Sequence, residues 1–174
     1  NELKSFKPFP ARKVRPCVFE YIYFARPDSL LDGKSAYEHR KNLGLELAKE
    51  NKIDADIIVP VPDSGNAAAL GFSQYLGKKF ELGLIRNHYV GRTFIEPTQN
   101  IRSLGVKLKL SSTSTIVKNK SVILIDDSLV RGTTCHKIVK MLYASGAKEV
   151  HVRIACPEIK YPDFYGVDMP TKTD

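Results

Sequence analysis

Two adjacent carboxylates, Asp126 and Asp127, end the apolar segment that begins at Ser121, and a loop rich in hydroxyl groups follows them. Neighbouring like charges repel each other, so a binding partner has to offset the cost of keeping both groups ionised. A carboxylate pair can hold a hydrated Mg²⁺ ion or accept hydrogen bonds from two adjacent hydroxyl groups of a sugar. We therefore take Asp126 and Asp127 as candidate ligands for a metal ion and for a sugar.

The segment Ser128–Thr134 connects this acidic pair to the start of an expected helix. Unpaired backbone N–H groups and the helix dipole favour an anion at such a position. Gly132 lets a ligand approach the backbone closely, Thr133 and Thr134 add hydroxyl donors, and Arg131 lies beside them. A ribose 5-phosphate is one ligand that needs both the acids and this phosphate loop. The alternative is a plain turn with an ordinary threonine N-cap, whereas a Walker A loop is excluded because no GxxxxGK[ST] pattern occurs.

A second polar loop, Asp63-Ser64-Gly65, follows the apolar segment ADIIVPVP and precedes an alanine-rich helix. It offers backbone donors at a helix start, as the first loop does. Taken alone, this loop is better explained as an N-cap turn. Ligands of parallel sheets bind beyond the carboxyl ends of the strands, where both loops are expected, so we include Asp63, Ser64 and Gly65 in the candidate site.

Expected strands and helices alternate along the chain. We expect strands over 17–25, 55–62, 80–85, 121–126 and 149–156, and helices within 35–51, 62–77 and 136–146. Ser35 and Glu38 have the spacing of a capping box at the start of the first helix, and Gly146 suits the end of the last one. Several strands are continuous apolar runs, which indicates burial on both faces. The pattern predicts an α/β fold with a mainly parallel sheet flanked by helices.

The stretch from Arg86 to Lys109 has no clear hydrophobic period and carries many cations. Segments of this length are usually functional or mobile loops. The cations that could neutralise a polyphosphate are Arg86, Arg92, Arg102, Lys107 and Lys109. The alternative is a solvated surface loop with scattered charges, and we assign no role to His88.

Composition limits the class of protein. The chain has 174 residues, 43% of them hydrophobic, which suits a single domain. Its net charge of +8 suits either nucleic acid or a polyphosphorylated small substrate as a partner. We do not expect nucleic-acid binding, because no long Lys/Arg run and no aromatic-basic alternation occur. We expect no membrane span, since no apolar run approaches roughly 20 residues. Cys17, Cys135 and Cys156 suggest neither a disulfide framework nor a zinc site, so we expect a reducing cytoplasm.

The stretch VILIDDSLVRGTT resembles the phosphoribosyl-pyrophosphate signature of type I phosphoribosyltransferases, which has an apolar strand, two acids, a short spacer and Gly-Thr-Thr. Four other segments resemble glutamine-dependent members of this family, which begin purine synthesis; they are PCVFEYIYFARPDS, VPVPDSG, RNHYVGRTFIEPTQNIR and PEIKYPDFYGVDMP. The resemblance implies a type I phosphoribosyltransferase fold over 16–174, after a linker or arm over 1–15. It also implies that ammonia displaces pyrophosphate from 5-phosphoribosyl 1-pyrophosphate (PRPP) with the help of Mg²⁺.

The same resemblance assigns roles to matching residues. Asp126 and Asp127 would bind the ribose hydroxyls and Mg²⁺, the segment Ser128–Thr134 would bind the 5-phosphate, and Asp63-Ser64-Gly65 would bind pyrophosphate. Ser64 would also contact the metal ion. The cationic loop, with Arg86 and Arg92, would close over the substrate and exclude water. No residue is required as a general base, and we expect a homo-oligomer.

The chain also departs from the glutamine-dependent pattern. Nothing in it resembles their glutaminase domain or their C-terminal helices, so we expect ammonia itself as the nitrogen donor. Cys17 and Asp163 stand where some relatives have iron–sulfur ligands, but the set is incomplete and Cys17 suits a core thiol. Two alternatives stay open: a purine salvage phosphoribosyltransferase, and a substrate-binding or regulatory module without turnover.

Overall fold

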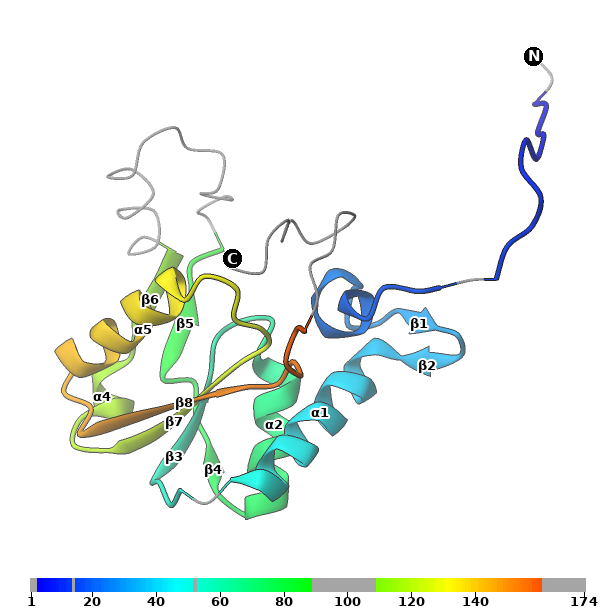
Figure 1. The fold of residues 1–174 in the computed structure, drawn as a ribbon. Helices are drawn as coiled ribbons and strands as arrows, with labels where there is room; N and C mark the ends of the chain where they lie inside the picture. The colour runs from blue at the N-terminus through cyan, green and yellow to red at the C-terminus, as the bar shows by residue number, and fades with distance from the viewer. Residues whose placement is uncertain (1–2, 14, 52, 89–108, 161–174) are drawn as a thin grey trace.

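The structure is a computed structural model that describes residues 3–13, 15–51, 53–88 and 109–160. Its centre is a four-stranded sheet of order β4-β3-β7-β8, in which all neighbouring strands are parallel. The strands are β3 (Ile57–Pro60), β4 (Lys79–Phe80), β7 (Ser121–Asp126) and β8 (Glu149–Ile154). Helices α1 (Ala36–Glu50) and α2 (Asn66–Leu76) lie on one face, and α5 (Thr133–Ala144) lies on the other (Figure 1). The predicted α/β fold with a mainly parallel sheet is confirmed.

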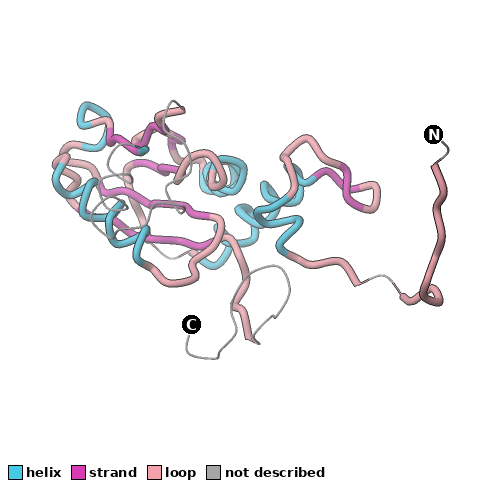
Figure 2. Tube along the Cα trace, turned by 90° about the horizontal axis from the view of Figure 1, so that it is seen from above, coloured by secondary structure: helices cyan, strands magenta, loops and turns pink. Residues whose placement is uncertain are grey.

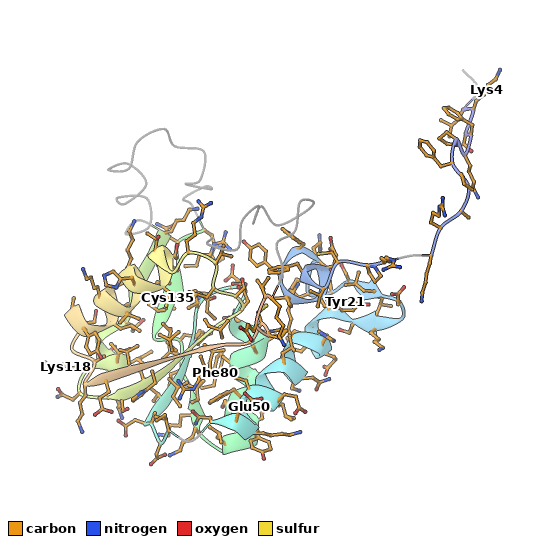
Figure 3. The ribbon with its side chains drawn as sticks, in the orientation of Figure 1. Lys4, Tyr21, Glu50, Phe80, Lys118 and Cys135 are labelled. Atoms are coloured by element: carbon orange, nitrogen blue, oxygen red, sulfur yellow. The ribbon has the colours of Figure 1, made fainter. Side chains whose placement is uncertain are left out.

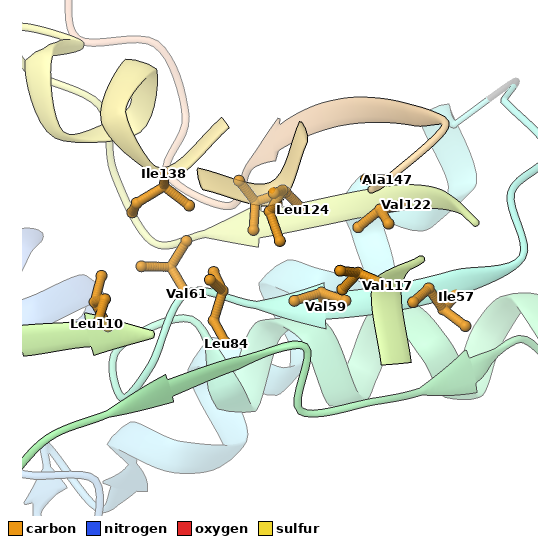
Figure 4. Packing of buried hydrophobic residues seen from close by; sticks show 11 residues of the cluster. Ile57, Val59, Val61, Leu84, Leu110, Val117, Val122, Leu124, Ile138 and Ala147 are labelled. Carbon is orange, nitrogen blue, oxygen red and sulfur yellow. The ribbon is translucent and has the colours of Figure 1, made fainter. Parts of the chain in front are cut away.

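Two hydrophobic cores lie on opposite faces of β3 and β7, because successive side chains of a strand point to opposite sides. The core on the α5 side includes Ile57, Val59, Val122, Leu124, Ile138 and Leu142 (Figure 4). The core on the other side includes Ile58, Ile123, Ile125, Ala68 and Phe72. Burial on both faces explains why these two strands are continuous apolar runs in the sequence.

Helices α1 and α2 pack in direct backbone contact through two glycines. A Cβ atom at Gly44 would lie 1.8 Å from the carbonyl oxygen of Ala68, and one at Gly71 would lie 2.0 Å from that of Lys41. The capping box at the start of α1 is confirmed, since the Ser35 hydroxyl accepts a hydrogen bond from the Glu38 N–H at 3.3 Å. The close packing of α1 against α2 fixes the position of α1 above the sheet.

The predicted strand over 17–25 is wrong. This segment contains a single π-helical turn, η1 (Glu20–Phe24), which contacts α1 and buries Ile22 to 2% exposure. The β-branched and aromatic composition favours a strand, but a strand also needs a neighbour with which to pair. Here the carbonyl groups of Glu20, Tyr21 and Ala25 accept hydrogen bonds from the side chain of Arg40 instead.

The single strand predicted over 80–85 is also wrong, because the chain divides there between two sheets. Strand β4 ends at Phe80, and β5 (Leu84–Arg86) pairs antiparallel with β6 (Leu110–Ser112). Gly83 lies between them, and a Cβ atom at this position would lie 2.8 Å from Cγ2 of Val59. The glycine lets the chain pass close to β3 as it changes sheets.

Besides β6, three further short elements were not predicted. Strands β1 (Leu30–Leu31) and β2 (Lys34–Ser35) form a hairpin, and α4 (Ser114–Val117) is a single helical turn. The hairpin turn is Asp32-Gly33, and both residues have positive φ angles, 50° and 76°. An Asp-Gly pair is a known hairpin signal, so the residues themselves could have revealed this turn.

The described part of the expected arm, residues 3–13, contains no helix or strand and extends away from the sheet (Figure 1, Figure 2). The three cysteines, Cys17, Cys135 and Cys156, are free and partly buried. No helix among the described residues has the length and apolar character needed to cross a membrane. Asp163 and most of the cationic loop lie outside the described residues.

Candidate functional site

The two candidate loops leave the sheet at the same edge, from adjacent parallel strands. Pro60 of β3 is in register with Ile125 of β7, and the N–H of Val61 donates to the carbonyl oxygen of Ile125 at 2.8 Å. The loop 63–65 therefore begins beside the point at which β7 ends in Asp126. The structure brings together at this edge the two segments that sequence reasoning selected separately.

Gly65 packs directly against β7. A Cβ atom at this position would lie 2.5 Å from the carbonyl oxygen of Ile125 and 2.9 Å from that of Val61. Only glycine permits this approach without displacing the backbone. Gly65 therefore holds its loop, and the partly exposed Ser64 before it, against the end of the strand that carries the acids.

Asp127 is a buried carboxylate with an unsatisfied oxygen. Its side chain is 6% exposed, and Oδ1 accepts a hydrogen bond from the Ser128 hydroxyl at 2.6 Å. Oδ2 is buried and has no hydrogen-bond partner among the described residues. Buried polar atoms without partners are rare and costly, so this oxygen is suited to accept a bond from a ligand or to bind a cation.

The surroundings of Asp126 disfavour the ionised form of its carboxyl group. Burial, together with the negative charge of Asp127, raises the pKa of Asp126 to about 7. The Asp127 N–H donates to Asp126 Oδ1 at 2.9 Å, which acts in the opposite direction without cancelling the effect. A cation beside the pair would relieve both the repulsion and the competition from protons.

Strand β8 fixes the backbone of the acidic pair. The N–H of Ala155 donates to the Asp126 carbonyl at 2.9 Å, and the N–H of Cys156 donates to the Asp127 carbonyl at 2.8 Å. Cys135 lies in the first turn of α5 (Figure 3), and the negative charge of Asp126 acts on its thiol. Burial and the nearby carboxylates raise the pKa of both thiols, so neither is an activated nucleophile.

The predicted phosphate loop leads into α5 as expected. Gly132 is the N-cap residue with φ 69°, and no side chain caps the helix. The first backbone N–H to bond within the helix is that of His136, which donates to the Gly132 carbonyl at 2.9 Å. The earlier N–H groups of the first turn have no acceptor in the helix and are available to an anion. Arg131, Thr133 and Thr134 are exposed beside them.

Arg86 makes direct contact with the other loop. Its guanidinium Nη1 lies 2.7 Å from Oδ2 of Asp63, and both side chains are partly exposed. The Asp63 carboxylate therefore holds the Arg86 guanidinium beside this loop. The N–H of Asn87 donates to the Lys109 carbonyl at 2.7 Å, which brings the two ends of the cationic loop together. Its other candidate cations, Arg92, Arg102 and Lys107, lie outside the described residues.

Sequence reasoning missed Arg40. This residue lies on α1 in a stripe of buried positions spaced by four, with the small residues Ala36, Gly44 and Ala48. Burial lowers the pKa of Arg40, and the negative charge of Asp127 acts to raise it. A charged side chain at helical spacing among small buried residues is the signal that could have identified it.

The oxygen ligands at this site suit Mg²⁺ better than a metal ion whose ligands all come from protein side chains. Within the part of the chain that the structure describes, no group of three or more His, Cys, Asp or Glu side chains could hold a metal ion. Mg²⁺ is usually held by one or two carboxylates together with waters and substrate phosphates. The acidic pair and the orphaned Asp127 oxygen meet that requirement.

Comparison with known proteins identifies the family of this chain. Residues 28–162 match the profile of the phosphoribosyl transferase domain. The chain is 58% identical to an amidophosphoribosyltransferase of Rhizobium etli over 94% of this chain and 33% of the relative. It is 55% identical to an amidophosphoribosyltransferase of Methanocaldococcus jannaschii over 100% of this chain and 37% of that protein.

Solved structures show the same architecture. One is the glutamine PRPP amidotransferase from B. subtilis complexed with ADP and GMP, with a TM-score of 0.78 and 52% identity, covering 90% of this chain and 34% of that one. The chain thus spans about a third of the length of the relatives that it matches. The type I phosphoribosyltransferase fold expected from the sequence is confirmed. Because the matched profile includes the acidic pair and both loops, the chain belongs to the phosphoribosyl transferase domain family.

Proposed function

We propose that this chain is the phosphoribosyltransferase part of an amidophosphoribosyltransferase, an enzyme of purine synthesis. It replaces the pyrophosphate of PRPP with ammonia and yields 5-phosphoribosylamine. The observation that carries the proposal is the buried oxygen of Asp127 that has no hydrogen-bond partner. It lies at the edge of the sheet where both candidate loops leave the adjacent strands β3 and β7. The names of relatives with 58% and 55% identity support the choice of ammonia over a purine base.

The chain's own residues would position PRPP from both ends. The Asp127 carboxylate accepts hydrogen bonds from the ribose hydroxyls, and the first turn of α5 binds the 5-phosphate through backbone N–H groups. Arg86 stands beside the loop 63–65, where the pyrophosphate would lie, and neutralises charge that develops as pyrophosphate leaves. Ammonia already carries its lone pair, so the reaction needs no nucleophilic side chain.

Asp126 and Asp127, with the Ser64 hydroxyl, are the residues that would hold Mg²⁺. When bound, Mg²⁺ would stabilise the negative charge of the leaving pyrophosphate. Burial and mutual repulsion already disfavour two ionised carboxylates here, so the pair gains most from a cation that accompanies the substrate. We also propose a homo-oligomer, which the exposed apolar side chains of Val18, Tyr23 and Phe24 support.

Calorimetry followed by a turnover assay tests the proposal. We expect the chain to bind PRPP in the presence of Mg²⁺ and then to release pyrophosphate when ammonia is supplied. Asp127→Asn should abolish both, whereas the matched control Asp54→Asn, at an exposed ion pair with Lys78, should change neither. Turnover with a purine base but not with ammonia would identify a salvage enzyme, and binding without any turnover would identify a substrate-binding module.

A further inference from the structure

Arg40 carries a full charge in a buried position of α1. Its side chain is 6% exposed and faces the segment that contains η1. A buried guanidinium is costly unless its donors are paired. The hydrogen-bond partners of Arg40 therefore determine whether its guanidinium pairs with a carboxylate of the acidic pair.

Within the described residues, the hydrogen bonds of Arg40 go to backbone carbonyl groups in and next to η1. Nε donates to Tyr21 at 2.8 Å, and Nη2 donates to Ala25 at 2.7 Å and to Glu20 at 3.5 Å. Figure 1 shows η1 beside the first turns of α1, and Figure 3 places Tyr21 on η1. These three acceptors come from one short segment, so the orientation of the guanidinium depends on the docking of that segment.

Asp127 lies close enough for its charge to act on Arg40, yet the two form no direct ion pair in the described residues. Oδ2 of Asp127 stays without a hydrogen-bond partner although a guanidinium is nearby. A buried carboxylate and a buried guanidinium would ordinarily pair directly. The competing acceptors on η1 explain why they do not.

We propose that Arg40 is a positioning residue whose guanidinium is held on the carbonyl groups of η1, and that this keeps Asp127 open to its ligand. If η1 moves away, Arg40 loses its acceptors and becomes free to pair with Oδ2 of Asp127, the buried carboxylate oxygen that has no hydrogen-bond partner. The docked state of η1 then sets the affinity of the acidic pair for its ligand. This inference rests on the proposed role of Asp127 in binding PRPP with Mg²⁺.

Destabilising η1 without touching the site tests the idea. Ile22 is 2% exposed in η1, and Ile22→Ala should weaken the binding of PRPP with Mg²⁺ by about tenfold, as measured by calorimetry. The matched control Leu30→Ala changes an exposed apolar side chain of β1, which is 71% exposed, and should leave the affinity unchanged. Thermal unfolding checks that each variant is folded, and Ile22→Val should give a smaller loss in the same direction if Ile22→Ala unfolds.

The deciding measurement is the double variant with Arg40→Met. Removing the guanidinium in the Ile22→Ala background, or in Ile22→Val, should restore most of the lost affinity, because no cation is left to pair with Asp127. A purely structural role of Arg40 predicts a further loss, since two supports of η1 are then missing. A double variant that binds no better than Ile22→Ala, or equal affinity of Ile22→Ala and wild type, would overturn the inference. Failure of the wild type to bind PRPP would instead refute the proposed function.

Discussion

Asp126→Asn should stabilise the ligand-free protein at neutral and alkaline pH. The folded state raises the pKa of Asp126 from 3.8 to about 7, so the native protein binds a proton more tightly than the unfolded chain. Stability therefore falls as the pH rises from about 4 to 7, and the loss is constant above that range. At about 1.36 kcal/mol per pH unit, this loss approaches about 4 kcal/mol.

Thermal unfolding at pH 5 and pH 8, in the presence of a chelator, measures this effect. For a chain of this size about 1 kcal/mol corresponds to roughly 2–4 °C, so the full loss corresponds to about 8–16 °C in Tm at pH 8. Asp126→Asn cannot ionise, so its Tm at pH 8 should exceed that of the wild type, with a smaller difference at pH 5. Asp54→Asn, whose carboxylate is exposed and paired with Lys78, is the matched control and should show no such gain.

Two results would refute this reasoning. One is an Asp126→Asn variant whose stability changes with pH as steeply as that of the wild type, because the titrating group would then lie elsewhere. The other is a wild-type protein that gains stability between pH 5 and pH 7 relative to the variant, because the sign of the pKa change at Asp126 would then be reversed.

Three further substitutions test other parts of the site and fold. Gly65→Ala should destabilise the protein by about 1–3 kcal/mol in chemical unfolding, since its Cβ would lie 2.5 Å from the Ile125 carbonyl oxygen; an unchanged midpoint would contradict that contact. Arg86→Ala should lower PRPP affinity by about tenfold with a change in stability below about 1 kcal/mol, because its ion pair with Asp63 is exposed. Equal affinity by calorimetry would exclude Arg86 from the site. Ser35→Ala should cost about 1 kcal/mol by loss of the α1 N-cap, measured by thermal unfolding, and no cost would mean that the cap is dispensable.

Local patterns were sufficient for the elements whose shape depends on nearby residues. The capping box at Ser35 and the doubly buried strands β3 and β7 could be predicted because a cap spans one turn and a continuous apolar run needs no knowledge of its neighbours. The segment 17–25 could not, because its strand-like composition gave no sign that the side chain of Arg40 would occupy its carbonyl groups. Hydrogen bonds between distant segments override local propensity in such cases.

The sequence by itself determined which chemical groups the site contains. Asp126 and Asp127 are adjacent in the chain, so their proximity was fixed by covalent connection alone, and a short loop joins them to Gly132 and Thr133. The tertiary structure decided how those groups behave: Arg86 pairs with a residue 23 positions away, and burial raises the pKa of Asp126 to about 7. Solvation and electrostatic interaction depend on what surrounds a group in space, and those surroundings come from segments that only folding brings together.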